Sequence, residues 1–252
     1  MYRILKKIYI ALIPSFLKFK IEPHIRNLIF KLAYKGNAFL CPICKAELNR
    51  FITYKFENFD DKICPKCGSL SRTRSLTLYI ENSFDFTGYS ILDFSPHRSF
   101  YNYWQKKNVN YVANDFENEF LAHTNYDITS LKFNTEDFDL IICYHILEHV
   151  QDDDKAIEEL FRVLKNKGVL IAQVPFTNKK TDEDLSITSP ELRIKRFGQE
   201  DHVRYYGKND FIQKLELKGF TVETCLFSKT LPEKKIIYYG LHDQDTIFIC
   251  KK

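Results

Sequence analysis

The run Phe138-Asp139-Leu140-Ile141-Ile142-Cys143-Tyr144 is followed directly by His145-Ile146-Leu147-Glu148-His149-Val150 in this chain of 252 residues. A short apolar run bounded by polar residues predicts a buried strand over Phe138–Tyr144. Downstream, Asp152 or Asp153 predicts the N-cap of a helix over Asp153–Leu164, and Gly168 ends the unit. This stretch therefore predicts a strand–helix unit, and it decides the fold class.

The same alternation continues on both sides of this unit. Further strands are expected at Ser90–Phe94, Tyr111–Asn114, Val169–Val174, Phe220–Phe227 and Thr246–Cys250, and helices at Ser71–Ser83, Phe100–Lys107 and Asn209–Lys218. Such alternation is typical of an α/β fold, in which a mostly parallel sheet carries helices on both faces. The last two strands are expected to form a hairpin, which places one antiparallel strand in the sheet.

Charge is unevenly distributed along the chain. The net charge is +4, but residues 1–40 hold eight Lys and Arg against the single acid Glu22, so this segment carries +7 and the remainder −3. Ile4, Leu5, Ile8 and Leu12 share one helical face. We interpret residues 1–40 as a basic amphipathic helical arm packed on the body. The alternative is that residues 1–35 lie on an anionic membrane surface or on RNA.

The apolar run at residues 8–17 is similar to the core of a secretion signal. Pro14 interrupts it, Lys18 and Lys20 follow it, and no small-residue cleavage site is present. A bilayer needs about 20 apolar residues, so the run is also too short to span one. We therefore expect a cytoplasmic protein, with peripheral contact at the inner membrane surface as the alternative.

Four of the seven cysteines form two close pairs, Cys41-Pro-Ile-Cys44 and Cys64-Pro-Lys-Cys67, separated by 19 residues. A C-x-x-C turn presents two thiolates on one side of a knuckle, and two such turns supply the four ligands of tetrahedral zinc. The alternative is four unrelated buried cysteines. We predict that Cys41, Cys44, Cys64 and Cys67 bind a structural zinc ion in a small zinc-ribbon module over residues 41–70.

Acidic residues stand where three predicted strands or short segments end. Asp93 ends Ser90–Phe94 in the run Ile91-Leu92-Asp93, Asp115 follows the second strand, and Asp127 lies in a third short segment. Ligands of such sheets bind beyond the carboxyl ends of the strands. A carboxylate after the second strand suits a ribose diol, because it accepts hydrogen bonds from both hydroxyls. We therefore expect these three acids to meet at one nucleoside.

Residues 88–176 resemble the class I methyltransferases. The resemblance rests on Phe138-Asp139-Leu140-Ile141-Ile142, on His145-Ile146-Leu147-Glu148-His149-Val150, and on Glu159-Leu160-Phe161-Arg162-Val163-Leu164-Lys165 with Gly168. It is strongest to the branch that acts on small molecules. The chain is also similar to a bacterial group with a cysteine knuckle ahead of this domain and a loop like Phe197–Gly207. The resemblance implies a doubly wound, seven-stranded sheet over residues 71–252.

The resemblance also implies a cofactor, S-adenosylmethionine. By position, Asp115 would hold its ribose, Asp127 and Ile128 would read the adenine edge, and Asp93 would lie under the methionine end. Tyr144 and His145 would line the floor near the sulfonium. The remaining residues expected at the cofactor are Ser95, His97 and Phe116.

The loop after the first strand departs from the family pattern. The family has three glycines here, where this chain has Ser95, His97 and Ser99. Glycine permits close backbone approach and positive φ. The substitution leaves three alternatives: weaker cofactor binding, a different path of the loop, or loss of activity.

For catalysis we expect His202 to act as general base on an oxygen nucleophile, because imidazole titrates near neutral pH. Asp201 would orient His202, and Arg204 would bind an anionic group of the substrate; the alternative is a surface loop whose charges only pair with each other. The sequence His145-x-x-Glu148-His149 also matches an inverted zinc-protease motif, which requires both histidines on one helix. Because His145 directly follows a buried strand, we interpret the motif as part of the methyltransferase pattern.

These observations predict a methyltransferase that acts on an oxygen of a small molecule or glycan. One alternative is RNA methylation, with the knuckle and the basic arm binding phosphates. The other is a methyltransferase fold that has lost catalysis and serves as a binding module. The sequence does not indicate the acceptor or the oligomeric state.

Overall fold

A computed structural model describes residues 15–55, 60–242 and 245–252. Two compact units are present, and each is described by itself. The first comprises residues 1–83 and 228–243, and the second comprises residues 84–227 and 244–252. The boundary thus falls after the helix Ser71–Ser83, which the sequence had placed in the second domain, and residues 228–243 join the N-terminal unit. The apolar face of Ile4 to Leu12 lies outside the described residues.

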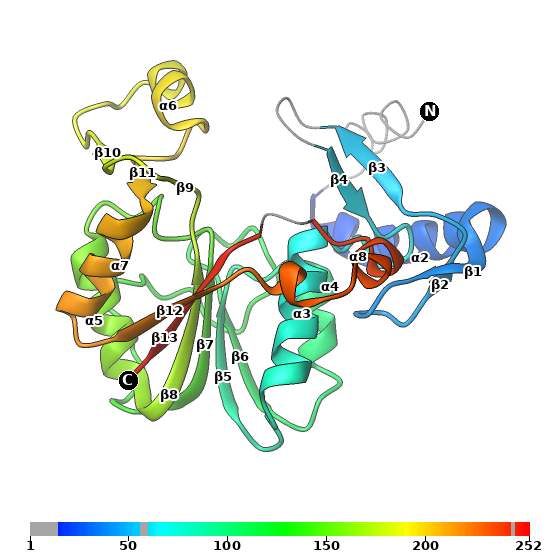
Figure 1. Cartoon of the computed structure of the whole chain (residues 1–252), viewed down its shortest axis with the longest axis horizontal. Helices are drawn as coiled ribbons and strands as arrows, with labels where there is room; N and C mark the ends of the chain where they lie inside the picture. Colours follow the sequence, from blue (N-terminus) through cyan, green and yellow to red (C-terminus); the bar gives the residue numbers. More distant parts are fainter. Residues whose placement is uncertain (1–14, 56–59, 243–244) are drawn as a thin grey trace. The chain divides into compact units, whose positions relative to one another are not determined.

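A six-stranded sheet forms the centre of the second unit (Figure 1). Its strands, in spatial order, are β12 (Thr221–Cys225), β13 (Ile247–Lys251), β8 (Leu164–Gln173), β7 (Phe138–Tyr144), β5 (Ser90–Phe94) and β6 (Asn110–Asn114). β6, β5, β7 and β8 pair in parallel, whereas β13 runs antiparallel to both β8 and β12. The expected mostly parallel sheet with one antiparallel strand is confirmed.

The sheet has six strands among the described residues rather than the predicted seven. Beyond β6, one parallel bridge joins Asn114 to Thr124. The Asn114 side chain replaces further ladder bonds, because its Oδ1 accepts from Tyr126 N at 2.8 Å and its Nδ2 donates to Tyr126 O at 2.9 Å. The segment that carries Asp127 is therefore held at the sheet edge by a side chain and does not become a strand.

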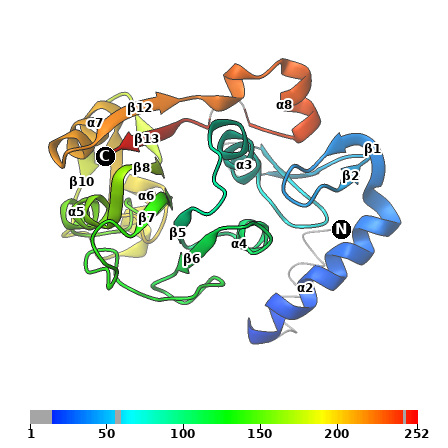
Figure 2. The same ribbon diagram turned by 90° about the horizontal axis from the view of Figure 1, so that it is seen from below.

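Helices cover both faces of this sheet. On one face, α5 (Asp153–Val163) and α7 (Lys208–Leu217) share a hydrophobic cluster with β5, β7, β8 and β13. The opposite side carries α4 (Arg98–Trp104) (Figure 2). The Trp104 ring stacks on Tyr111 of β6, with the ring centroids 6.0 Å apart. Asp152 is the N-cap of α5 and accepts from Lys155 N at 3.0 Å. The doubly wound arrangement expected from the sequence is confirmed.

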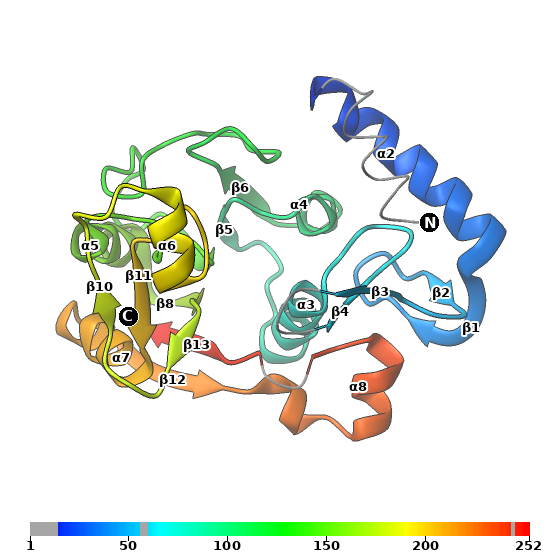
Figure 3. The same cartoon turned by 90° about the horizontal axis from the view of Figure 1, so that it is seen from above.

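A small lobe leaves the carboxyl end of β8. It contains β9 (Phe176–Thr177), β10 (Asp182–Glu183), α6 (Pro190–Phe197) and β11 (Arg204–Gly207), with β11 between the other two short strands (Figures 1 and 3). The loop Phe197–Gly207, which carries the residues expected to act in catalysis, therefore lies at the end of the sheet where the parallel strands terminate.

The first unit contains α2 (Ser15–Ile29), a π-helical turn (Phe30–Tyr34), two small hairpins, α3 (Ser71–Ser83) and α8 (Glu233–Tyr239). One hairpin pairs β1 (Lys35–Leu40) with β2 (Glu47–Leu48), and the other pairs β3 (Ile52–Lys55) with β4 (Asp60–Ile63). None of the helices in the described part of the chain combines the length and the apolar character that crossing a bilayer requires.

Candidate cofactor, acceptor and metal sites

Asp93, at the end of β5, is buried with 2% of its surface exposed. Tyr111 of β6 donates a hydrogen bond from its hydroxyl to Asp93 Oδ2 at 3.0 Å. Burial raises the pKa of the Asp93 carboxyl well above its usual range, and the hydrogen bond from Tyr111 opposes this only in part. Asp93 therefore forms a buried polar contact at the base of the predicted cofactor site.

Ser95 takes the backbone conformation for which the family uses glycine. Its φ is +44°, in the left-handed region. Its N–H donates to Asn114 O at 2.8 Å, and its hydroxyl donates to Asp115 Oδ1 at 2.7 Å. His97 is the N-cap of α4, and its Nδ1 accepts from Ser99 N at 3.2 Å. Side-chain hydrogen bonds thus define the loop in the absence of glycine.

Asp115 follows β6 and is also buried, at 2% exposed. Its Oδ1 accepts from Ser95, and its Oδ2 accepts from Phe120 N at 2.8 Å. A carboxylate has about four acceptor positions, so two protein donors leave it able to accept further bonds. The next residue, Phe116, has 56% of its surface exposed, which is unusual for a phenyl ring beside a buried carboxylate.

Asp127 and Ile128 lie directly after the segment that Asn114 holds. Asp127 Oδ1 accepts from both the N–H and the hydroxyl of Thr129 at 2.8 Å, and Asp127 itself is exposed. Ile128 is buried, at 6% exposed. Hydrogen bonds therefore connect the segments of all three predicted acids, through Ser95 to Asp115 and through Asn114 to Tyr126.

Tyr144 and His145 stand at the end of β7. His145 adopts a φ of +55°, its N–H donates to Gln173 O at 2.8 Å, and its Nδ1 lies 3.1 Å from Glu148 Oε1. Two buried oxygens here have no hydrogen-bond partner among the described residues, namely Glu148 Oε2 and Gln173 Oε1. Unpaired buried oxygens are costly, so they mark the ends of β7 and β8 as a place where a ligand would be stabilising.

The structure brings Glu148, His149 and His202 together. One carboxylate oxygen and one ring nitrogen from each histidine lie within 4.8 Å of one another. The two imidazole rings meet edge to face, with centroids 4.7 Å apart. His202 is 3% exposed, and burial lowers the pKa of its imidazole. Its Nδ1 lies 3.1 Å from Phe197 O.

The sequence suggested that Asp201 orients His202, but in the structure Asp201 pairs with His149 instead. Its carboxylate Oδ2 lies 2.9 Å from Nδ1 of His149. The reason is local: His202 points inward to the Phe197 carbonyl, whereas the neighbouring Asp201 is exposed. His149, which the sequence suggested to be a helix residue near the substrate pocket or simply a packed one, thus receives the carboxylate partner.

Arg204 also differs from expectation, because it is 1% exposed and its guanidinium is committed within the protein. Nη1 donates to Leu147 O at 2.9 Å and Nη2 donates to Gln151 O at 2.8 Å. Nε pairs with Glu183, and Asp153 lies 3.7 Å away. Arg204 therefore ties the lobe to the turn after β7 and has its charge paired internally, so it is not placed to bind an anionic group of a substrate.

The inverted zinc-protease geometry is absent from this turn. His145 follows β7 in a left-handed conformation, and residues 147–149 form a turn rather than a helix before α5 begins at Asp153. Glu148 and His149 nevertheless belong to the His202 cluster, a relationship that depends on residues more than fifty positions apart.

The four cysteines of the first unit converge. Cys41 Sγ lies 3.7 Å from Cys67 Sγ, and Cys44 Sγ lies 3.8 Å from Cys64 Sγ. Zinc with four Zn–S bonds of about 2.3 Å requires S···S separations of about 3.8 Å in a tetrahedron. Because the separations agree, these thiolates fit a zinc ion, which would cross-link the knuckles without an open position for chemistry.

Arg74 of α3 is fully buried beside this cluster and was not identified from the sequence. Its guanidinium donates to Ser69 O at 2.5 Å, Lys62 O at 2.8 Å and Tyr239 O at 2.8 Å, and also to Gly240 O. It thereby joins the second knuckle to α8. Its positive charge would also offset the net negative charge of a zinc ion bound by four thiolates.

Comparison with known proteins supports the same family. Residues 88–172 match a family described as a methyltransferase domain. A Methanocaldococcus jannaschii protein, uncharacterized protein MJ0638, is 40% identical over 75 residues, which cover 28% of this chain and 33% of the relative. The chain thus spans about a third of the length of this curated relative.

One of two similar solved structures shares the fold by TM-score. A SAM-dependent methyltransferase from Archaeoglobus fulgidus superposes with a TM-score of 0.51 at 15% identity, covering 71% of this chain and 92% of that chain. A Haloferax volcanii methyltransferase, solved in complex with the Trm112 activator, gives a TM-score of 0.46 at 14% identity, covering 65% and 82%. Residues 88–172 are thus similar to a methyltransferase domain, the sheet has the fold of a solved SAM-dependent methyltransferase, and four cysteines cluster near the N-terminus.

Proposed function

We propose that this protein transfers the methyl group of S-adenosylmethionine to an oxygen of a small molecule or glycan. The observation that carries the proposal is the Asp115 carboxylate, which is buried at the end of β6 and oriented by Ser95 and Phe120. A carboxylate held in this way is suited to accept from the two hydroxyls of a ribose.

The neighbouring residues fit the rest of the nucleoside. The exposed phenyl ring of Phe116 follows Asp115 and offers a flat apolar face to an adenine. Asp127 and Ile128 directly follow Tyr126, whose backbone is bonded by the Asn114 side chain. In this position a side-chain oxygen of Asp127 and the backbone N–H of Ile128 can bind the edge of the adenine. Asp93 then remains beneath the methionine end, with Ser95 and His97 shaping the loop above it.

When bound, the cofactor supplies an electrophilic methyl group on a sulfonium. The protein must place an acceptor hydroxyl in line with it and remove the hydroxyl proton. Glu148 and His149 lie four and five residues beyond Tyr144 in the chain, and His202 belongs to the Phe197–Gly207 loop. With His202 Nδ1–H donated to Phe197 O, Nε2 carries the lone pair that a general base requires. This arrangement supports transfer to oxygen.

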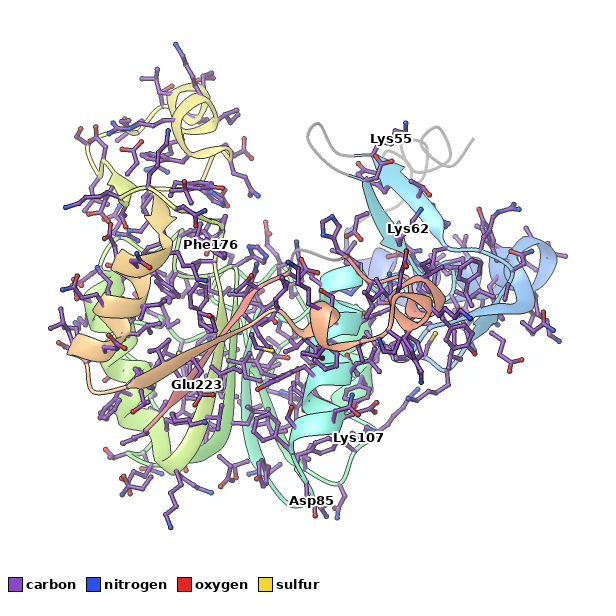
Figure 4. The ribbon with its side chains drawn as sticks, in the orientation of Figure 1. Lys55, Lys62, Asp85, Lys107, Phe176 and Glu223 are labelled. Carbon is purple, nitrogen blue, oxygen red and sulfur yellow. The ribbon has the colours of Figure 1, made fainter. Side chains whose placement is uncertain are left out.

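Calorimetry with S-adenosylhomocysteine tests the proposal. Wild-type protein should bind it, and Asp115→Ala should weaken binding by about 1–3 kcal/mol through lost charge-assisted bonds. Asp85→Asn is the matched control, because Asp85 is an exposed carboxylate at the end of this unit away from Phe176 (Figure 4). Folded wild-type protein that binds no S-adenosylhomocysteine would leave only the binding-module alternative. Steeply salt-dependent binding of structured RNA would favour RNA methylation instead.

A further inference from the structure

We propose that Glu148, His149 and His202 form a second metal site, separate from the cysteine cluster, which takes a divalent first-row transition ion. The three side chains come from the turn after β7 and from the loop after α6. Their candidate ligand atoms lie within 4.8 Å of one another. Ligands at about 2.0–2.2 Å from one ion lie roughly 3–3.5 Å apart, so side-chain rotations of about an ångström would close the set.

Both histidines have the hydrogen bonds expected of metal ligands. His149 Nδ1 lies 2.9 Å from the Asp201 carboxylate, and His202 Nδ1 lies 3.1 Å from Phe197 O. In each ring the proton is therefore assigned to Nδ1, where it has an acceptor, and the lone pair to Nε2. Metal-binding histidines usually donate their other ring N–H to a carboxylate or backbone carbonyl in this way.

Glu148 supplies the observation that points to a ligand. The side chain is fully buried, at 0% exposed, and its Oε2 has no hydrogen-bond partner among the described residues. Its Oε1 lies 3.1 Å from His145 Nδ1, which fixes the orientation of the carboxylate. A buried carboxylate oxygen without a donor is strongly unfavourable. A cation held between this oxygen and the two imidazoles would remove that cost.

The ligand types decide the class of ion. Two imidazoles and one carboxylate suit Zn²⁺, Fe²⁺, Co²⁺ or Mn²⁺, whereas Mg²⁺ and Ca²⁺ favour sites made of oxygen. Three protein ligands leave positions for an exogenous oxygen, unlike the closed set of four cysteines.

The role of this ion rests on the proposed function. An acceptor hydroxyl bound to the ion would have a lowered pKa and would release its proton to solvent. The resulting oxyanion forms the new O–C bond while the C–S bond breaks, and the electron pair of that bond remains on sulfur as a neutral thioether. In that case His202 acts as a metal ligand and not as a base.

Cobalt titration of the full chain, with zinc retained on the cysteines, tests the site. Wild-type protein should bind one Co²⁺ and show d–d absorption without the thiolate charge-transfer band that cobalt on cysteine would give. His149→Ala and His202→Ala should each weaken Co²⁺ binding at least tenfold. His24→Ala, which removes an exposed imidazole of α2, should bind as wild type does.

Glu148→Gln keeps the shape of the buried side chain and should also weaken Co²⁺ at least tenfold, with circular dichroism verifying the fold of every variant. The proposal is overturned if zinc-loaded wild type takes up no Co²⁺, or if folded Glu148→Gln and His202→Ala bind it unchanged. S-adenosylhomocysteine calorimetry separates the two claims. Cofactor binding without Co²⁺ binding would refute the metal site alone, whereas Co²⁺ binding without cofactor binding would refute the proposed function alone.

Discussion

Ser95 donates a hydrogen bond from its hydroxyl to Asp115 Oδ1 at 2.7 Å, and this bond joins the ends of two neighbouring parallel strands, β5 and β6. The family uses glycine at this position for its backbone freedom. Here serine adopts the left-handed conformation and in addition orients the acid predicted to hold the ribose. The absent glycine is thus replaced by a residue with a second role.

Ser95→Ala and Ser95→Gly should separate these two roles. Alanine loses the bond to Asp115, worth about 1–2 kcal/mol, and keeps the left-handed strain. Glycine loses the same bond but relieves roughly 1 kcal/mol of strain, so it should be the more stable of the two variants. Urea unfolding at neutral pH measures both. An alanine variant more stable than the glycine variant would show that the conformation is not strained.

Asp93→Asn should change how stability depends on pH. The pKa of Asp93 is raised in the folded state by burial, so the protonated carboxyl is favoured there. The stability that the protonated carboxyl contributes is fully present below its pKa in the unfolded chain, about 3.9. This stability is lost as the pH rises towards the pKa in the folded protein. The variant cannot ionise. Its free energy of unfolding relative to wild type should therefore increase with pH, by at most about 1.4 kcal/mol per unit.

Urea unfolding of wild type and Asp93→Asn at several pH values between 5 and 8 gives this difference. Other titrating groups are common to both proteins and cancel. A difference independent of pH over this range would mean that Asp93 is ionised in the native protein.

Arg204→Met should destabilise the protein by roughly 3 kcal/mol or more, because it removes the buried donor to the carbonyls of Leu147 and Gln151 and the positive charge paired with Glu183. Arg196→Gln is the control from the same lobe, since Arg196 forms exposed pairs with Asp182 and Asp184 and its loss should change stability little. Thermal and urea unfolding compare the two. If both substitutions change stability equally little, Arg204 is not structural and would again be a candidate for binding the substrate.

Metal analysis of the purified protein, followed by chelation, tests the cysteine cluster. About one tightly held zinc per chain is expected on the four thiolates, and its removal should unfold the knuckles around residues 41–70. Cys64→Ser should release this zinc, whereas Cys225→Ser, in β12 of the other unit, should retain it. A stable protein without metal on these cysteines would contradict the prediction.

Much of the fold follows from local pattern. The strand Phe138–Tyr144 and the helix Ser71–Ser83 have the predicted ends, because apolar runs and helical periodicity are strong local signals. The prediction of a seventh strand was wrong. The side chain of Asn114 forms hydrogen bonds with the backbone N–H and carbonyl of Tyr126, which a strand ladder would otherwise pair. Competition of a side chain with backbone pairing produces no periodic pattern in the sequence.

The sequence by itself determined the alternating fold, the two cysteine knuckles and the acids after successive strands, since each of these depends on residue type and spacing along the chain. Only the tertiary structure decided which partners those residues meet. In the folded protein, Asp201 pairs with His149 and His202 lies close to Glu148. Arg204 is buried and connects the small lobe to the turn after β7. The physical reason is that contacts between distant segments are set by how strands and loops pack, and the spacing within any one segment does not encode them.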